Sequence, residues 1–185
     1  KNIAGISGTR GRLMKIAVVG AGAIGGYIGT KLFAAWEEVW LIARGPHLKA
    51  IKHHGVRIYD SDSDITYRPN ATDDFQDVGI VDFILLTVKA HSLPTIVTAL
   101  DPLIGPETAI VSAQNGIPWW YFQCHGGPLD GTLLDTLDPD GIISRHIASN
   151  RIIGSIIYPS TEITSPGEIK HIEGDRLTIG EIDYS

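Results

Sequence analysis

The sequence has little of several features, and each shortage excludes a class of protein. A single cysteine, Cys124, stands among 185 residues, so no internal disulfide can form and no cysteine pattern indicates a zinc site. No apolar run approaches the roughly 20 residues that span a bilayer, and residues 1–13 lack the apolar centre of a signal peptide. We therefore expect a cytoplasmic protein with no membrane partner and no metal site.

Basic residues are also few and scattered. The chain has 15 Lys and Arg against 21 Asp and Glu, which gives a formal net charge of −6. Nucleic-acid binding needs clustered positive charge, so we expect no nucleic-acid partner. The acidic residues concentrate in a stretch that we expect to form a solvated edge of turns and short strands: Asp60, Asp62, Asp64, Asp73, Asp74 and Asp77.

Glycine is abundant, and its placement is the most informative feature of the chain. A G-x-G-x-x-G pattern follows the apolar run 16–19 and precedes a helical stripe of Ile24, Ile28 and Leu32. In this context the first glycine makes a tight turn, the second admits a pyrophosphate, and the third lets helix and strand pack closely. The helix start offers free N–H groups to the phosphates. The candidate cofactor-binding residues are Gly20, Ala21, Gly22, Ala23, Ile24 and Gly25.

The end of the second predicted strand indicates which dinucleotide is bound. In NAD-binding folds a carboxylate about 20 residues beyond the loop holds the ribose 2′-hydroxyl. Here the strand ends in Leu41-Ile42-Ala43-Arg44, which lacks a carboxylate and supplies an arginine. An arginine suits a 2′-phosphate, so the predicted cofactor is NADP(H). The alternative for Arg44 is a solvated position on a surface loop.

Two further candidates follow later strands. Ligands of open α/β sheets lie beyond the carboxyl ends of the strands, and the predicted strands 80–87 and 107–113 are followed by Lys89 and Asn115. Lys89 could reach the nicotinamide or a substrate anion, and Asn115 offers an amide donor and acceptor. For either residue alone, a solvated charge or a loop hydrogen bond is the alternative.

The chain alternates strands with helices, which predicts an α/β fold of Rossmann type. We expect a doubly wound, mostly parallel sheet with extra short strands in the C-terminal third. The expected strands are 15–19, 38–43, 56–59, 64–68, 80–87, 107–113, 152–158, 168–172 and 176–179. The expected helices are 23–35, 46–54 and 92–100, the last with Ser92 as a candidate N-cap and Pro94 in its first turn.

Two local features stand apart from this pattern. No glycine occurs between Ala35 and Glu38, so the helix 23–35 must end without the usual glycine cap. The aromatic cluster 119–122 follows Pro118, which favours packing at a helix start over a base-stacking platform, and a pocket wall is the remaining alternative.

Several motifs together resemble the N-terminal half of the ketopantoate reductase (2-dehydropantoate 2-reductase) family. The resemblance covers about residues 15–182, in the family's order and spacing. It rests on Gly20–Gly26, 41–45, 87–90, 114–116, and the stretch from Ser165-Pro166-Gly167 through His171 to 179–181. Trp36 stands where the family usually has glycine.

The resemblance implies a function and a role for each site residue. Gly20–Gly25 would hold the NADPH pyrophosphate, Arg44 the 2′-phosphate, and Lys89 and Asn115 the nicotinamide and the substrate. Ser160 falls near another cofactor contact of the family. Family members reduce the ketone of a 2-oxo acid with hydride from NADPH, and 2-dehydropantoate becomes pantoate on the way to coenzyme A, a step of pantothenate biosynthesis.

The residues and the resemblance together imply a division into domains. Residues 1–13, which precede the only methionine, Met14, are expected to be an N-terminal extension or cloning remnant, and residues 14–185 an NADP-binding domain. The family's proton-donating lysine lies in a following helical domain, and no residue here matches it, so no catalytic residue is assigned up to Ser185. We expect this polypeptide to bind NADPH without turning over substrate.

Three alternatives stay open from the sequence alone. The chain could serve another NADP-dependent hydroxy-acid dehydrogenase that acts on a different 2-oxo acid. It could be a non-catalytic nucleotide sensor whose occupancy shifts a partner domain. A full-length protein could also assemble as a homodimer, which this sequence does not decide.

Overall fold

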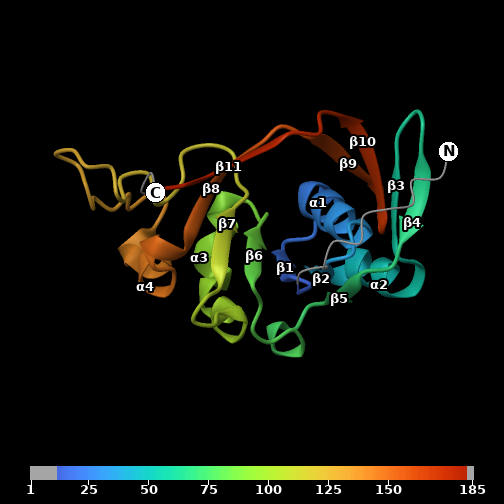
Figure 1. The fold of residues 1–185 in the computed structure, drawn as a ribbon, viewed down its shortest axis with the longest axis horizontal. Helices are drawn as coiled ribbons and strands as arrows, with labels where there is room; N and C mark the ends of the chain where they lie inside the picture. Colours follow the sequence, from blue (N-terminus) through green and yellow to red (C-terminus); the bar gives the residue numbers. More distant parts are fainter. Residues whose placement is uncertain (1–11, 183–185) are drawn as a thin grey trace.

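The computed structural model describes residues 12–182, and it contains two sheets (Figure 1). The expected N-terminal extension 1–13 falls largely outside the described residues. The main sheet has seven strands in the order β11-β8-β7-β6-β1-β2-β5, and every pair is parallel except β11 with β8. Its strands are β1 Lys15–Val19, β2 Glu38–Ile42, β5 Asn70–Thr72, β6 Phe83–Leu86, β7 Ala109–Ser112, β8 Ile152–Ile157 and β11 Leu177–Glu181.

Helices cover both faces of this sheet, as the Rossmann-type prediction requires. One face packs against α1 (Ala23–Ala34) and α2 (Gly45–His54) through Ile28, Leu48 and Ile51. The other face packs against α3 (Leu93–Ile96), the 3₁₀ segment 97–103 and α4 (Ile142–His146). Within residues 12–182, no helix is both long enough and apolar enough to cross a membrane.

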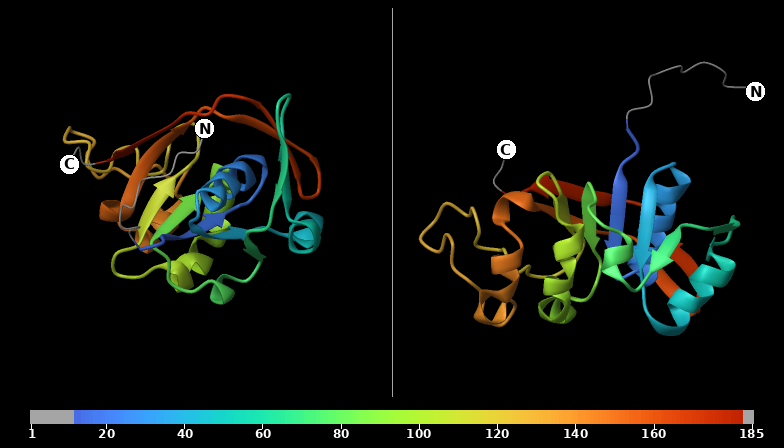
Figure 2. Two further views of the ribbon diagram at one scale, coloured as in Figure 1. Left: turned by 45° about the vertical axis from the view of Figure 1, so that its right-hand side comes forward. Right: turned by 90° about the horizontal axis from the view of Figure 1, so that it is seen from below.

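A second sheet of four strands lies against α1 on the side away from the main sheet (Figure 2). Its order is β4-β3-β10-β9, and β3 pairs in parallel with β10 although more than 100 residues separate them. Its strands are β3 Val56–Tyr59, β4 Asp64–Tyr67, β9 Ser160–Ser165 and β10 Glu168–Glu173. Ile169 packs onto α1 so closely that a Cβ on Gly26 would lie 2.5 Å from its Cδ1 atom. The extra C-terminal strands therefore hold α1 in place.

The structure corrects several sequence predictions. The expected helix 92–100 is α-helical only at Leu93–Ile96, because 3₁₀ turns flank it and Pro102 lies inside the second. Ser92 occupies the N-cap position, yet its side chain makes no capping bond, since its own backbone is already helical. Two strands and one α-helix were not expected, namely β5, β9 and α4.

Helix α1 ends in a Schellman motif built on Trp36 instead of glycine. Trp36 has φ +72°, its N–H donates to the Phe33 carbonyl at 3.0 Å, and the Glu37 N–H donates to the Leu32 carbonyl at 3.3 Å. This is how the helix ends without the usual cap. A residue with a Cβ adopts this left-handed backbone conformation at a cost of roughly 1 kcal/mol or more.

Replacing Trp36 therefore separates backbone strain from side-chain contacts. We expect Trp36→Gly to be more stable than Trp36→Ala by about 1 kcal/mol, because only glycine adopts positive φ without a Cβ clash. Urea unfolding of the two variants measures the difference. Equal stability would contradict the assignment of Trp36 to the left-handed cap.

Candidate functional site

The site is set by the topology of the main sheet. The chain leaves β1 for β2 on one side, and β6 pairs with β1 on the other side, so the strand order reverses between β1 and β6. Ligands of open α/β sheets bind at such a switch point, beyond the carboxyl ends of the strands. Gly20 follows β1 and Thr87 follows β6, so these two segments form the walls of the crevice.

The glycine loop is fixed to its neighbours by backbone contacts. Gly20 has φ +95°, and the N–H groups of Gly20 and Ala21 both donate to the Ile42 carbonyl, at 3.1 and 2.9 Å. A Cβ on Gly20 would lie 2.5 Å from Val88 Cγ1 and 2.8 Å from the Val88 nitrogen. Only glycine satisfies both the turn and this close approach.

The other two glycines of the pattern have different surroundings. A Cβ on Gly25 would lie 2.5 Å from the Gly20 carbonyl oxygen and would also overlap Thr87 Oγ1, which itself donates to the Gly20 carbonyl at 2.9 Å. Gly22 is open, since a Cβ there would meet nothing nearer than 3.9 Å. The loop is therefore packed at Gly20 and Gly25 and free at Gly22, the position expected to admit a pyrophosphate.

Helix α1 directs its N-terminal N–H groups into this crevice. Its N-cap is Gly22, which has no side chain to cap the helix, and its first turn contains no acidic residue. The amides of Ala23, Ile24 and Gly25 thus belong to a first turn that lacks internal partners. Together with the positive end of the helix dipole, they suit an anion.

Arg44 lies beyond the carboxyl end of β2, at the N-cap of α2. Its side chain is exposed, and within residues 12–182 it forms neither an ion pair nor a hydrogen bond. The end of β2 supplies no carboxylate that could hold a ribose 2′-hydroxyl. Arg44 is therefore free to pair with a ligand anion.

Lys89 and Asn115 follow β6 and β7 at the same edge of the sheet. Lys89 is exposed and has no charged partner in the described chain. The Asn115 amide is partly engaged, because its Nδ2 donates to the Ile157 carbonyl at 3.0 Å and its Oδ1 accepts from the Ile157 N–H at 3.1 Å. One N–H and one lone pair of that amide remain for a ligand. The loop hydrogen bond considered for Asn115 thus exists.

Ser160 begins β9, three residues beyond the carboxyl end of β8. Since β8 is parallel to β7, Ser160 leaves the sheet at the same edge as Asn115. The structure thus brings all the candidate residues to the side of the sheet where the parallel strands have their carboxyl ends. They lie on the segments that follow β1, β2, β6, β7 and β8.

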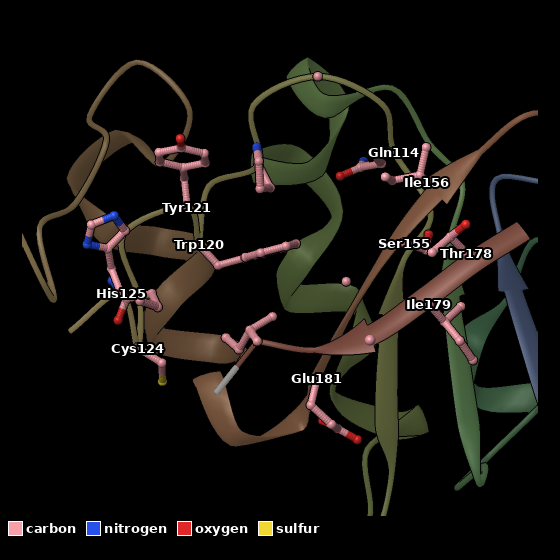
Figure 3. A pocket seen from close by; sticks show the side chains of 16 residues that line it. Gln114, Trp120, Tyr121, Cys124, His125, Ser155, Ile156, Thr178, Ile179 and Glu181 are labelled. Carbon is pink, nitrogen blue, oxygen red and sulfur yellow. The ribbon is translucent and has the colours of Figure 1, made fainter. Parts of the chain in front are cut away.

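A hollow of about 560 Å³ adjoins this edge beside Gln114 and Gly116 (Figure 3). Trp120, Tyr121 and His125 form one wall, and residues of β8 and β11 form the other. The aromatic segment was expected to pack a helix start, and that prediction is wrong, because the segment 119–124 forms turns. Trp119 is buried in the core, whereas Trp120 is the pocket wall of the alternative interpretation. The hollow does not include the glycine loop.

Three residues that connect the segments around the crevice were not predicted as site residues, namely Thr87, Gln114 and His47. Thr87 ties the glycine loop to the end of β6, and Gln114 donates from Nε2 to the Val88 carbonyl at 2.6 Å. His47 accepts at Nδ1 from the Gly167 N–H at 3.1 Å. Helical spacing could have indicated His47, since it precedes the buried Ile51 by four residues. In residues 12–182, no cluster of three or more His, Cys, Asp or Glu could hold a metal ion.

The strand order, the switch point and the glycine loop define a Rossmann-type domain with a dinucleotide-binding loop. The particular family follows from comparison with known proteins. The chain belongs to the ketopantoate reductase family, because the family model described as Ketopantoate reductase PanE/ApbA matches residues 16–119.

Individual relatives agree with this assignment. A 2-dehydropantoate 2-reductase of Mesorhizobium japonicum is 43% identical over 169 residues, which are 91% of this chain and 52% of that protein. One of Pyrococcus horikoshii is 35% identical over 161 residues, 85% of this chain and 52% of that protein. A solved structure from Ralstonia solanacearum, assigned as a ketopantoate reductase, has a TM-score of 0.87 at 39% identity and covers 92% of this chain and 53% of its own. The chain thus spans about half the length of the relatives that it matches.

Proposed function

We propose that this chain supplies the cofactor-binding half of an NADPH-dependent reductase of 2-oxo acids, of the 2-dehydropantoate type. The observation that carries the proposal is the glycine loop at the switch point, packed at Gly20 and Gly25 and open at Gly22. Arg44, which has no side-chain partner in residues 12–182 and stands in the place of a ribose-binding carboxylate, supports NADPH over NADH. The names of the relatives support the substrate class.

The residues present fit this cofactor, which when bound would supply the hydride. The amides of Ala23, Ile24 and Gly25 would hold the pyrophosphate, and Arg44 would hold the 2′-phosphate. Lys89 and the free N–H of Asn115 would orient the nicotinamide and the substrate carboxylate, and Ser160 would add a cofactor contact. We assign the proton donor to the part of the relatives' length that this chain does not span.

The assay that tests the proposal compares two lengths of protein. NADPH absorbance is followed with 2-dehydropantoate for the 185-residue chain and for the full-length product of its gene, here called the extended protein. We expect turnover only from the extended protein, because only that protein would hold the proton donor. Turnover by the 185-residue chain would contradict the division of roles.

The same assay separates the alternatives. An extended protein that reduces another 2-oxo acid instead would be a different hydroxy-acid dehydrogenase. One that binds NADPH but reduces no 2-oxo acid would favour the nucleotide sensor. A homodimer is a further proposal for the extended protein, and sedimentation velocity tests it.

A further inference from the structure

His47 lies where three parts of the chain meet. It belongs to the first turn of α2, directly after Pro46. Its Nδ1 accepts a hydrogen bond of 3.1 Å from the N–H of Gly167, the turn residue between β9 and β10, which has φ +83°. The ring also lies beside the backbone of Ala21, inside the glycine loop, which favours the charged form of the ring. One imidazole therefore lies between α2, the second sheet and the cofactor loop.

These contacts fix the charge and the tautomer of the ring. An Nδ1 that accepts from Gly167 carries no proton, so the proton of the neutral ring is on Nε2. Nε2 is buried and has no hydrogen-bond partner among residues 12–182. Burial lowers the pKa of His47, and the Ala21 backbone offsets part of that effect. The ring is therefore neutral at pH 7.

The structure shows few other hydrogen bonds that hold the glycine loop among the described residues. Gly20 and Ala21 are fixed to β2 by the Ile42 carbonyl, and Thr87 bonds the Gly20 carbonyl from β6. Next to Ala21, Gly22 is open, and it begins the helix turn whose amides face the crevice. A group that holds the Ala21 backbone thus influences where those amides point.

We propose that neutral His47 is a positioning residue that holds the glycine loop against the β9–β10 turn, so that dinucleotide affinity falls when the ring takes up a proton. The proposal rests on the proposed dinucleotide function and adds a pH-sensitive support to that site. A proton on Nδ1 would abolish the acceptor for Gly167 and place two N–H donors against each other. The turn and the loop would then lose their shared contact.

The direction of the pH effect follows from the lowered pKa. The unfolded chain takes up this proton near the ordinary value of 6.5, and the folded chain only at lower pH. The stabilising contribution of neutral His47 is therefore complete above 6.5 and is lost as the pH falls toward the folded pKa. The glycine loop 20–26 has no charged residue. The ionisable groups on the other packed elements are Arg44 at the N-cap of α2, Lys49, Lys52, His53 and His54 of α2, Arg57 and Tyr59 of β3, and Glu162, Glu168, Lys170, His171 and Glu173 of β9 and β10.

The test compares His47→Asn with His47→Leu. The Asn amide oxygen can take the place of Nδ1 and does not titrate, whereas Leu has no acceptor. We expect the NADP⁺ affinity of wild type to fall, as the pH is lowered from about 7.5 through the folded pKa of His47, by about 3- to 10-fold more than that of His47→Asn, the range of one hydrogen bond. His47→Leu should bind weakly throughout this pH range. Affinities equal to wild type in both variants, with parallel pH profiles, would overturn the proposal.

A second readout does not need the nucleotide. His47→Leu should speed hydrogen exchange at the Ala21 amide while the core amide of Ile84 keeps its protection, and His53→Asn, on the same helix, should change neither. Unchanged exchange at Ala21 would overturn the role of His47. If wild type binds no dinucleotide at any pH, the proposed function fails, and the exchange data still decide whether His47 positions the loop.

Discussion

Arg44→Ala should weaken NADPH binding by about 10- to 150-fold and leave NADH binding nearly unchanged. A hydrogen bond to a charged group contributes about 1.5–3 kcal/mol, which corresponds to that range. The Arg44 side chain is exposed and forms no ion pair or hydrogen bond among the described residues, so its removal breaks neither. The loss should therefore come from the 2′-phosphate alone. Calorimetric titration with each nucleotide measures both affinities.

The matched control for this variant is Lys49→Ala. Lys49 is an exposed cation on the same helix, five positions beyond Arg44. If general charge attraction held the cofactor, both substitutions would weaken binding alike. We expect Lys49→Ala to stay within about twofold of wild type, as exposed charges at a distance are screened. An equal loss of NADPH and NADH affinity in Arg44→Ala would contradict a contact with the 2′-phosphate.

Two alanine substitutions in the glycine loop should affect different properties, one the stability of the fold and the other the affinity for the cofactor. Gly25→Ala should lower the free energy of unfolding by about 1–3 kcal/mol, because its Cβ would lie 2.5 Å from the Gly20 carbonyl oxygen. Gly22→Ala should fold like wild type, because its Cβ meets nothing nearer than 3.9 Å and its φ of −77° suits alanine. Its methyl group would instead occupy the path of the pyrophosphate. Urea unfolding measures both stabilities.

Gly22→Ala is therefore the more selective test of the cofactor site. If the alanine methyl group overlaps the pyrophosphate at a cost of about 1–3 kcal/mol, NADPH affinity would fall by about 5- to 150-fold. The loss should apply to NADH as well, since both nucleotides carry the same pyrophosphate. A Gly22→Ala protein that binds NADPH like wild type would show that the ligand does not approach this loop.

The central parallel strands could be predicted because their signal is local. The strand predicted at 15–19 coincides with β1, a short apolar run buried on both faces. Strand β9 was missed, because Ser160–Ser165 is mostly polar and exposed and forms a strand only by pairing with β10. The pairing of β3 with β10 depends on contacts between distant segments, which no local pattern encodes.

Some residues of the candidate site could likewise be located from local sequence, and others depend on contacts between distant segments. The turn at Gly20 and the tight packing at Gly25 involve neighbours in sequence and the adjacent strand, so the motif was enough to locate them. His47 depends on Gly167, which is 120 positions away, so its role emerges only from the fold. Asn115 shows a third case, because the sequence allowed a ligand contact or a loop bond, and its amide has capacity for both.

An amide NMR titration of the 185-residue chain with NADPH tests the dinucleotide site most directly. We predict that the resonances of Ala21–Gly25 and Arg44 shift most, with smaller changes at Lys89 and Asn115. Shifts confined to the hollow lined by Trp120 and Ile179 would contradict it, because that hollow lies away from the glycine loop. An unchanged spectrum at saturating NADPH would contradict it as well.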